Sequence, residues 1–358
     1  MKKLNKVLST GLCLAVLFLT SCSSDDDSTP SGGIDYPFEN GVFVLNEGNF
    51  GAANSSVSFL SNEGVMTHDI YSLVNGEPLG DVAQSIYMDG DLAYIVINGS
   101  GKIEVLNRFT FEKVGTISSD LVNPRYMTIS GDKGYVTNWG NPADPDDDFV
   151  AVVNLENYTV SSTIPVTEGP EQIVAANGKL FVAQNGGWGF GNTVAVISTS
   201  SQNVIKTIQV HDVPASMAVA YDVVYVLCSG KESWTGEETL GGLTAIDALT
   251  DIEISQETFA VGSHPNHLVT DGSQLFYSDG DLVYAADLID VSLSNLLFST
   301  ADQGVYGIYG LGVNKGKIYV ADALDYISDG RVLVYKSSGE LENVYNAGLL
   351  PNDFGFNN

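Results

Sequence analysis

A short apolar stretch that ends in small polar residues recurs along the whole chain. Each copy has an aromatic residue near its centre, and these aromatics are Phe43, Tyr94, Tyr135, Phe181, Tyr225, Phe276 and Tyr319. Their spacings are 51, 41, 46, 44, 51 and 43 residues. Short strands with Gly-rich turns at a period in the forties are typical of four-stranded propeller blades. The pattern predicts an all-β fold, a seven-bladed β-propeller, and no segment sustains the 3.6-residue period of a helical solenoid.

Each repeat contains further strand signals around its apolar strand. A shorter strand precedes it in several copies and begins at Pro124, Pro170, Pro214 or Pro265. Proline suits a strand's first residue, where no ladder donor is lost. An alternating strand and an edge strand follow, as at 194–197 and 204–208.

The first repeat differs from the others because no proline-led strand precedes Val42. Residues 351–356 repeat the proline-led pattern at the far end of the chain, with no further repeat after them. We therefore expect this C-terminal strand to complete the first blade. Such a closure of the ring removes the open edge that a linear array would present.

The amino terminus has the character of a targeting segment. Lys2, Lys3 and Lys6 precede an apolar run over 7–19, which is too short for an ordinary membrane-spanning helix. The run ends in small residues before Cys22, a pattern that resembles a bacterial lipobox with Cys22 as the lipidated first mature residue; the alternative is a plain secretory signal with an incidental cysteine. We expect a lipoprotein signal peptide over 1–21, a lipidated acidic tether over 22–37 and the propeller over 38–358.

An acidic cluster over 25–27 follows this cysteine. It resembles the surface-export signal of Bacteroidetes-type lipoproteins and is also a solvated tether, since Ser, Asp, Pro and Gly form no core. The resemblance implies an outer-membrane, cell-surface protein whose only membrane contact is the lipid anchor. Beyond Cys22 only Cys228 remains, and its apolar surroundings indicate a buried small hydrophobe.

The formal charge of the whole chain is −29. Such a field repels phosphate backbones, which excludes a general nucleic-acid binder. The chain also lacks a Gly-x-Ser-x-Gly elbow, a His-Glu-x-x-His motif, a paired Cys-x-x-Cys and a phosphate-cradling loop. The sequence therefore gives no catalytic candidate, no required cofactor and no enzyme assignment.

Candidate binding residues lie in the loops that converge on one mouth of a propeller, where function usually resides. All three tryptophans of the chain fall in these predicted loops, together with many carboxamides. Trp is well buried on average, so three in loops at one end indicate a binding platform. The alternative is that each Trp plugs its own blade and each Asn caps a turn. The candidate ligand-binding residues are Asn49, Phe50, Arg125, Tyr126, Asn138, Trp139, Asn185, Trp188, Phe190, Trp234, His267, Tyr306 and Tyr326.

Two further features have simpler interpretations. A lone loop histidine such as His267 is more often a turn residue than a ligand. Asp144, Asp146 and Asp148 offer hard oxygens to Ca²⁺, but a solvated acidic loop is the interpretation we favour, so no metal site is predicted.

The repeat strands carry a family resemblance. Tyr135-Val136-Thr137-Asn138 and the opening 45–51 are similar to the YVTN/YncE-like propellers common among Bacteroidetes lipoproteins. With the lipobox and the acidic cluster, the chain resembles the BtuG-type surface lipoproteins. That resemblance implies a protein that binds cobalamin and other corrinoids and delivers them to a TonB-dependent outer-membrane transporter.

The chemistry of a corrin suits such loops, because aromatic faces stack on its flat ring and Asn, Gln and Ser pair with its amides. Two alternatives stay open. The same loops suit a glycan or a partner protein. A lactonase-type propeller enzyme would need convergent carboxylates and a metal at the channel mouth.

Overall fold

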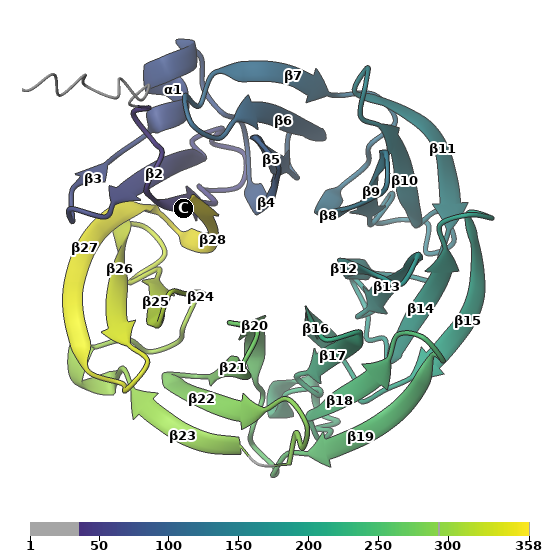
Figure 1. Ribbon diagram of the computed structural model, residues 1–358. Coiled ribbons are helices and arrows are strands. Elements are labelled where there is room, and N and C mark those ends of the chain that lie inside the picture. Colours follow the sequence, from purple (N-terminus) through teal and green to yellow (C-terminus); the bar gives the residue numbers. More distant parts are fainter. Residues whose placement is uncertain (1–35, 293, 358) are drawn as a thin grey trace, which may run out of the picture. The chain divides into compact units, whose positions relative to one another are not determined.

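The structure is a computed structural model that describes residues 36–292 and 294–357. In this part of the chain seven four-stranded antiparallel sheets stand around a central axis, as the blades of a propeller (Figure 1). The predicted seven-bladed fold is confirmed. The predicted signal peptide, Cys22 and nearly all of the tether lie outside the described residues. Within those residues, no helix has both the length and the apolar character needed to cross a bilayer.

The innermost strand of each blade lies nearest the central axis of the ring (Figure 1). Several of these strands start on proline, as predicted. In blade order they are β28 (Pro351–Asn357), β4 (Ala83–Asp89), β8 (Pro124–Ser130), β12 (Pro170–Ala176), β16 (Pro214–Ala220), β20 (Asn266–Thr270) and β24 (Gly310–Asn314).

The second strands are the apolar repeats seen in the sequence. They are β1 (Gly41–Asn46), β5 (Leu92–Ile97), β9 (Lys133–Asn138), β13 (Lys179–Gln184), β17 (Val223–Cys228), β21 (Gln274–Asp279) and β25 (Lys317–Asp322). Most of their residues are buried on both faces, because the neighbouring blades cover both sides of the sheet. Cys228 is free and buried here, as predicted.

The third strands are also largely buried. They are β2 (Ser56–Ser61), β6 (Lys102–Asn107), β10 (Phe149–Asn154), β14 (Thr193–Ser198), β18 (Gly242–Asp247), β22 (Leu282–Asp287) and β26 (Asp329–Lys336). The outermost strands are more exposed. They are β3 (Met66–Thr67), β7 (Lys113–Ile117), β11 (Thr159–Pro165), β15 (Asn203–Gln209), β19 (Ile252–Thr258), β23 (Ser294–Ser299) and β27 (Leu341–Leu349). Three short helices lie between strands: α1 (Ile70–Asn75), η1 (Ser233–Thr235) and η2 (Ala301–Gln303).

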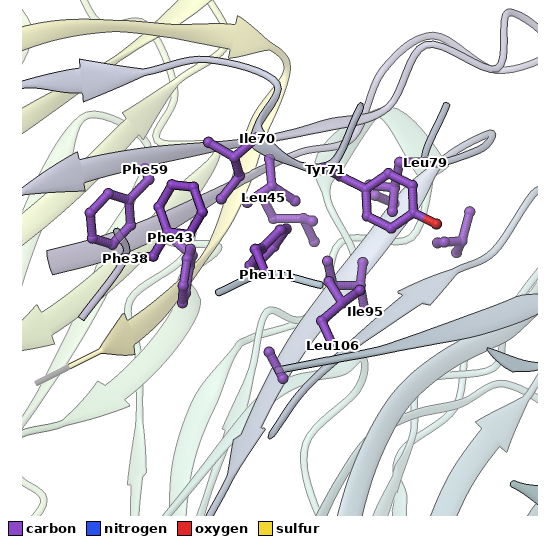
Figure 2. Close-up of a cluster of buried hydrophobic side chains, with 14 residues drawn as sticks. Phe38, Phe43, Leu45, Phe59, Ile70, Tyr71, Leu79, Ile95, Leu106 and Phe111 are labelled. Atoms are coloured by element: carbon purple, nitrogen blue, oxygen red, sulfur yellow. The ribbon is translucent and has the colours of Figure 1, made fainter. Parts of the chain in front are cut away.

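Seven apolar clusters fill the seams between successive blades. Alternate side chains of one strand pack into the seams on opposite faces of the blade. Phe43 and Leu45 of β1 pack toward blade 2, where α1 adds Ile70 and Tyr71 (Figure 2). Val42 and Val44 pack toward blade 7 instead. The core is therefore a closed series of interfaces, and each blade depends on both neighbours.

The C-terminal strand closes the ring. β28 pairs antiparallel with β1, with Val42 opposite Phe356 and Val44 opposite Phe354. Nδ2 of the buried Asn357 donates to the carbonyl oxygens of Phe38 and Arg108. The predicted completion of the first blade by the C-terminal strand is confirmed.

Candidate ligand-binding site

Bulges at the start of the inner strands shape the site. In six of the seven blades, the pairing register between the inner strand and the second strand shifts at the beginning of the inner strand. These shifts all lie at the same mouth of the ring. A bulge leaves residues out of the ladder and re-aims their side chains. The residues released in this way are Gln84, Arg125, Tyr126, Glu171, Gln172, Ala215, His267, Leu268 and Asn352. All of them line one axial cavity.

This cavity has a volume of about 630 Å³. Loops that follow the second strands add further lining residues around its opening, including Glu47, Asn185, Phe190, Ser229 and Trp234. Polar groups from all seven blades therefore converge on one space, which a rigid scaffold holds in place with little ordering cost on binding.

Arg125 joins three blades at one side of the cavity. Its Nε and Nη2 donate to the two carboxylate oxygens of Glu171 at 2.9 and 2.7 Å, and its Nη1 donates to Oε1 of Gln84 at 2.5 Å. The guanidinium also lies 4.1 Å from the ring centre of Trp139. A bidentate pair with a stacked aromatic fixes the orientation of this arginine.

Two carboxylates lie on other parts of the wall. Tyr309 donates its hydroxyl to Oε2 of Glu47 at 2.6 Å, and burial raises the pKa of Glu47 above its usual range. Asp353 accepts the backbone N–H groups of Ile86 and Phe354 at 3.0 and 2.8 Å. Burial raises the pKa of Asp353 to about 6.

His267 is a neutral polar group of this wall. Its Nδ1 lies 2.9 Å from Oγ of Ser278. Burial lowers the pKa of His267 to about 4, because the charged imidazolium loses its hydration there. The side chain therefore offers a neutral imidazole at pH 7.

The rim of the mouth carries exposed aromatic side chains. Trp188 is 64% exposed and Trp234 is 77% exposed. The Trp188 ring meets the Trp139 ring edge-on, with 5.6 Å between centroids. Nε1 of Trp234 donates to Glu232 at 2.8 Å. The other predicted aromatics of the mouth loops are also largely exposed: Phe50, Phe190, Tyr306 and Tyr326.

The structure distributes the predicted residues in three groups. Those that line the cavity are Arg125, Tyr126, Asn185, Phe190, Trp234 and His267. Those that lie in the surrounding loops, outside the cavity lining, are Asn49, Phe50, Trp139, Trp188, Tyr306 and Tyr326. Asn138 forms the third group by itself.

Asn138 does not reach the cavity. It is fully buried, its Nδ2 donates to the carbonyl oxygen of Val136, and its Oδ1 accepts the backbone N–H of Val122. Both ends of the amide thus satisfy backbone groups, so this residue stabilises a turn and the structure does not bring it to the cavity.

The acidic loop after β9 is not arranged as a cation site. Asp148 is buried and accepts the backbone N–H of Gly169 at 2.6 Å, whereas Asp144 accepts that of Asp146 at 3.2 Å. Among the described residues no group of three His, Cys, Asp or Glu side chains is placed to hold a metal. These carboxylates cap loop backbone instead of gathering around one point.

The cavity residues that the sequence analysis did not single out include Glu171, Tyr309, Asn352 and Asp353. Three of them directly follow, or lie two residues after, the proline that opens an inner strand. The same position holds Arg125 after Pro124. The position after the proline was therefore the available signal, because the bulge turns it toward the channel.

Comparisons with known proteins agree with this fold. Residues 40–323 match the family model of a domain of unknown function, DUF5074. A comparison with curated protein sequences finds no match.

Several solved structures share the architecture. A quinoprotein alcohol dehydrogenase-like protein from Bacteroides thetaiotaomicron is 16% identical, with a TM-score of 0.68 over 90% of this chain and 79% of that chain. Hydrazine synthase from Kuenenia stuttgartiensis is 15% identical, with a TM-score of 0.62 over 76% of this chain and 88% of that chain. A protein of unknown function from Desulfotomaculum acetoxidans is 12% identical, with a TM-score of 0.63 over 88% and 98%. At these identities the likeness concerns the fold alone.

Proposed function

The chain belongs to the DUF5074 family, and we propose that this member binds a corrinoid such as cobalamin at the mouth of its ring. The observation that carries the proposal is a polar cavity of about 630 Å³ below a rim of exposed aromatic side chains. A corrin is a broad, flat, amphipathic ring edged with amides. Its faces suit rings such as Trp188 and Trp234.

The cavity adds hydrogen-bonding groups for the amide edge. Gln172, Asn185 and Asn266 are among its lining residues, and a carboxamide pairs with another amide as donor and as acceptor. A cavity of this size takes a side arm or one edge of the ligand, while the rim covers the remainder. No cofactor beyond the bound corrinoid is part of the proposal.

The proposed biological setting is the outer surface of the outer membrane. In this proposal Cys22 carries the lipid anchor and the protein passes its ligand to a TonB-dependent transporter. The sequence of residues 1–37 supports the anchor, with its lysines, apolar run and acidic cluster. The role we propose is capture and delivery, not catalysis.

A second candidate ligand is a glycan. Solvent-exposed Trp188 and Trp234 favour it, since flat aromatic rings at a rigid surface also pack against sugar faces. The two candidates differ in what the cavity must accept, because a corrin carries many primary amides and a neutral glycan carries hydroxyls.

Calorimetric titration with cyanocobalamin tests the first candidate. We expect a Kd in the micromolar range or tighter for the wild-type protein. Replacing both Trp188 and Trp234 by Ala should weaken binding at least tenfold, since each aromatic contact contributes about 1 kcal/mol and about 1.4 kcal/mol corresponds to a factor of ten.

The control is Ile254→Ala, which replaces another largely exposed apolar residue, on the outer strand β19. This control should leave both Kd and Tm unchanged. The Trp double variant should also keep the wild-type Tm, because exposed substitutions usually change stability by less than about 0.5 kcal/mol. If the wild-type protein binds no corrinoid at micromolar concentration, the corrinoid proposal is wrong, and binding to a glycan array would then support the second candidate.

A further inference from the structure

The charges around the cavity are strongly unequal. Its lining contains four carboxylates, those of Glu47, Glu171, Glu232 and Asp353, against one guanidinium, that of Arg125. The chain as a whole carries a formal charge of −29. A concave site with low-dielectric walls concentrates such a field, so an anionic ligand meets repulsion on approach and inside the cavity.

The single arginine is already engaged. Its Nε and Nη2 donate to Glu171, its Nη1 donates to Gln84, and the Trp139 ring covers one face. Breaking this pair to bind a ligand carboxylate would leave Glu171 buried without its partner, which is costly. Arg125 therefore organises the wall and is not an anion receptor.

Glu47 keeps acceptor capacity toward a ligand. Its Oε2 accepts the hydroxyl of Tyr309, while no donor among residues 36–292 and 294–357 bonds its Oε1. The backbone on both sides of this side chain is fixed, since the Glu47 N–H donates to Leu350 and its carbonyl oxygen accepts the N–H of Ala83. A carboxylate held at the cavity wall in this way is a preorganised acceptor.

Asp353 is a second oriented acceptor on the adjacent strand. Each of its oxygens accepts one backbone N–H, from Ile86 or from Phe354, and a carboxylate has about four lone-pair sites. Asp353 pairs with Leu45 in the register of β28 and β1, one residue before Asn46 and two before Glu47. Both carboxylates therefore belong to the closing blade of the ring.

We propose that Glu47 and Asp353 determine the specificity of the cavity, selecting ligands that present N–H donors, as primary amide or ammonium, and rejecting ligands with a carboxylate at the same place. Hydrogen bonds from N–H groups to carboxylates are charge-assisted and about twice as strong as neutral ones. This inference deepens the proposed function and rests on it for the choice of corrinoid probes. For a corrinoid, the proposal means that amide N–H groups at the edge of the ring donate to Glu47 and Asp353.

The test compares cyanocobalamin with its monocarboxylic acids, in which one propionamide is hydrolysed to propionate. The wild-type protein should bind at least one of these acids ten or more times more weakly than cyanocobalamin. In Glu47→Gln this ratio should fall below about threefold, because a neutral amide replaces the repelling charge while retaining an acceptor for Tyr309. Asp353→Asn provides a second variant with the same expectation.

The matched control is Glu156→Gln, an exposed residue in the turn between β10 and β11. This substitution also removes one negative charge, but at the end of a blade that faces away from the cavity. The ratio of the two affinities should therefore stay as in the wild type. An unchanged ratio in a folded Glu47→Gln variant overturns the inference while the corrinoid proposal stands.

A second probe decides the case in which no corrinoid binds. Spermidine supplies ammonium groups, and its binding to the wild-type protein is compared with that to the Glu47→Gln, Asp353→Asn double variant. A loss of tenfold or more supports the donor-selective wall even though the corrinoid proposal has then failed. Equal binding by both proteins, or none by the wild type, overturns the inference as well.

Discussion

Gly169 shows how one residue controls the shape of the rim. Its φ is +71°, and a Cβ at this position would lie 1.8 Å from the backbone nitrogen of Gly187. Gly187 directly precedes Trp188, whose ring packs against Trp139. The close approach of two backbones thus positions an aromatic platform, and only glycine permits it.

Replacing Gly169 by Ala should therefore lower both stability and binding. The variant should lose about 1–2 kcal/mol of stability because alanine, unlike glycine, is strained in a left-handed backbone conformation. Its Cβ must also displace the turn that carries Trp188. Gly236→Ala is the matched control, since Gly236 has φ +83° but nothing within 4 Å of an added Cβ. Thermal unfolding should show a clearly larger loss for Gly169→Ala; equal losses in the two variants would contradict the role of the close approach.

Asp148 gives the stability a pH dependence of defined sign. The side chain is 3% exposed, and burial, the largest cause, raises its pKa to about 6 from the ordinary aspartate value of 3.8. A carboxyl whose pKa is higher in the folded state favours folding most when it is protonated. Its contribution is therefore fully present below pH 4 and is lost as the pH rises through about 6.

Asp148→Asn should remove this part of the pH dependence. The asparagine Oδ1 still accepts the N–H of Gly169 but does not ionise. The free energy of unfolding of the variant, relative to that of the wild type, should rise by up to about 3 kcal/mol from pH 4 to pH 7. This follows from about 1.4 kcal/mol per unit of pKa difference between the folded and unfolded states. Urea unfolding across this range measures the difference, and parallel curves for the two proteins would contradict the assignment.

At the scale of elements, the sequence was a good guide to strands and a poor guide to the walls of the site. The apolar repeats marked the second strands because burial on both faces leaves a continuous hydrophobic run. Proline marked the start of several inner strands. The bulge that follows that proline in four blades has no hydrophobic pattern of its own, since it depends on the pairing between two strands.

The bulges explain which site residues were found and which were missed. Arg125 and His267 stood out as polar residues in predicted turns, and the structure places both in the cavity lining. Their partners did not stand out, because Glu171 lies 46 residues from Arg125 and Tyr309 lies 262 residues from Glu47. Both contacts join neighbouring blades of the ring, and no local sequence pattern connects residues in different blades.

Asn138 lies away from the cavity, and the repeat pattern alone does not show this. A polar residue at the end of a second strand can point to the mouth or turn back to the backbone, and both fit the same repeat. Asn185 lies one position later in the next blade, where Trp139 stands in the repeat of Asn138, and it lines the cavity, while its Oδ1 also accepts the N–H of Gly187. Asn138 is the last residue of β9 and Asn185 the first residue after β13, so a difference of one position separates the two outcomes.

At the scale of the whole molecule, stability depends on the closure of the ring. The last seam contains Val42, Val44 and Phe354 of blade 1 together with Tyr319 and Val332 of blade 7. Two of the seven seams border blade 1, so losing its inner strand exposes apolar surface on both sides. The closing strand also carries Asp353, which makes closure and the candidate site parts of the same element.

Deleting residues 351–358 should therefore abolish the soluble monomer. The deletion removes every β28–β1 backbone hydrogen bond, uncovers the edge of β1, and leaves the apolar face of an incomplete blade exposed to other molecules. Size-exclusion chromatography with circular dichroism should show aggregation or loss of the cooperative transition. A synthetic peptide of residues 350–358 added during refolding should restore part of the monomer, because strand closure needs pairing and not chain continuity. A truncated protein that remains monomeric with an unchanged Tm would show that six blades and the remaining three strands suffice, and that β28 serves the site alone.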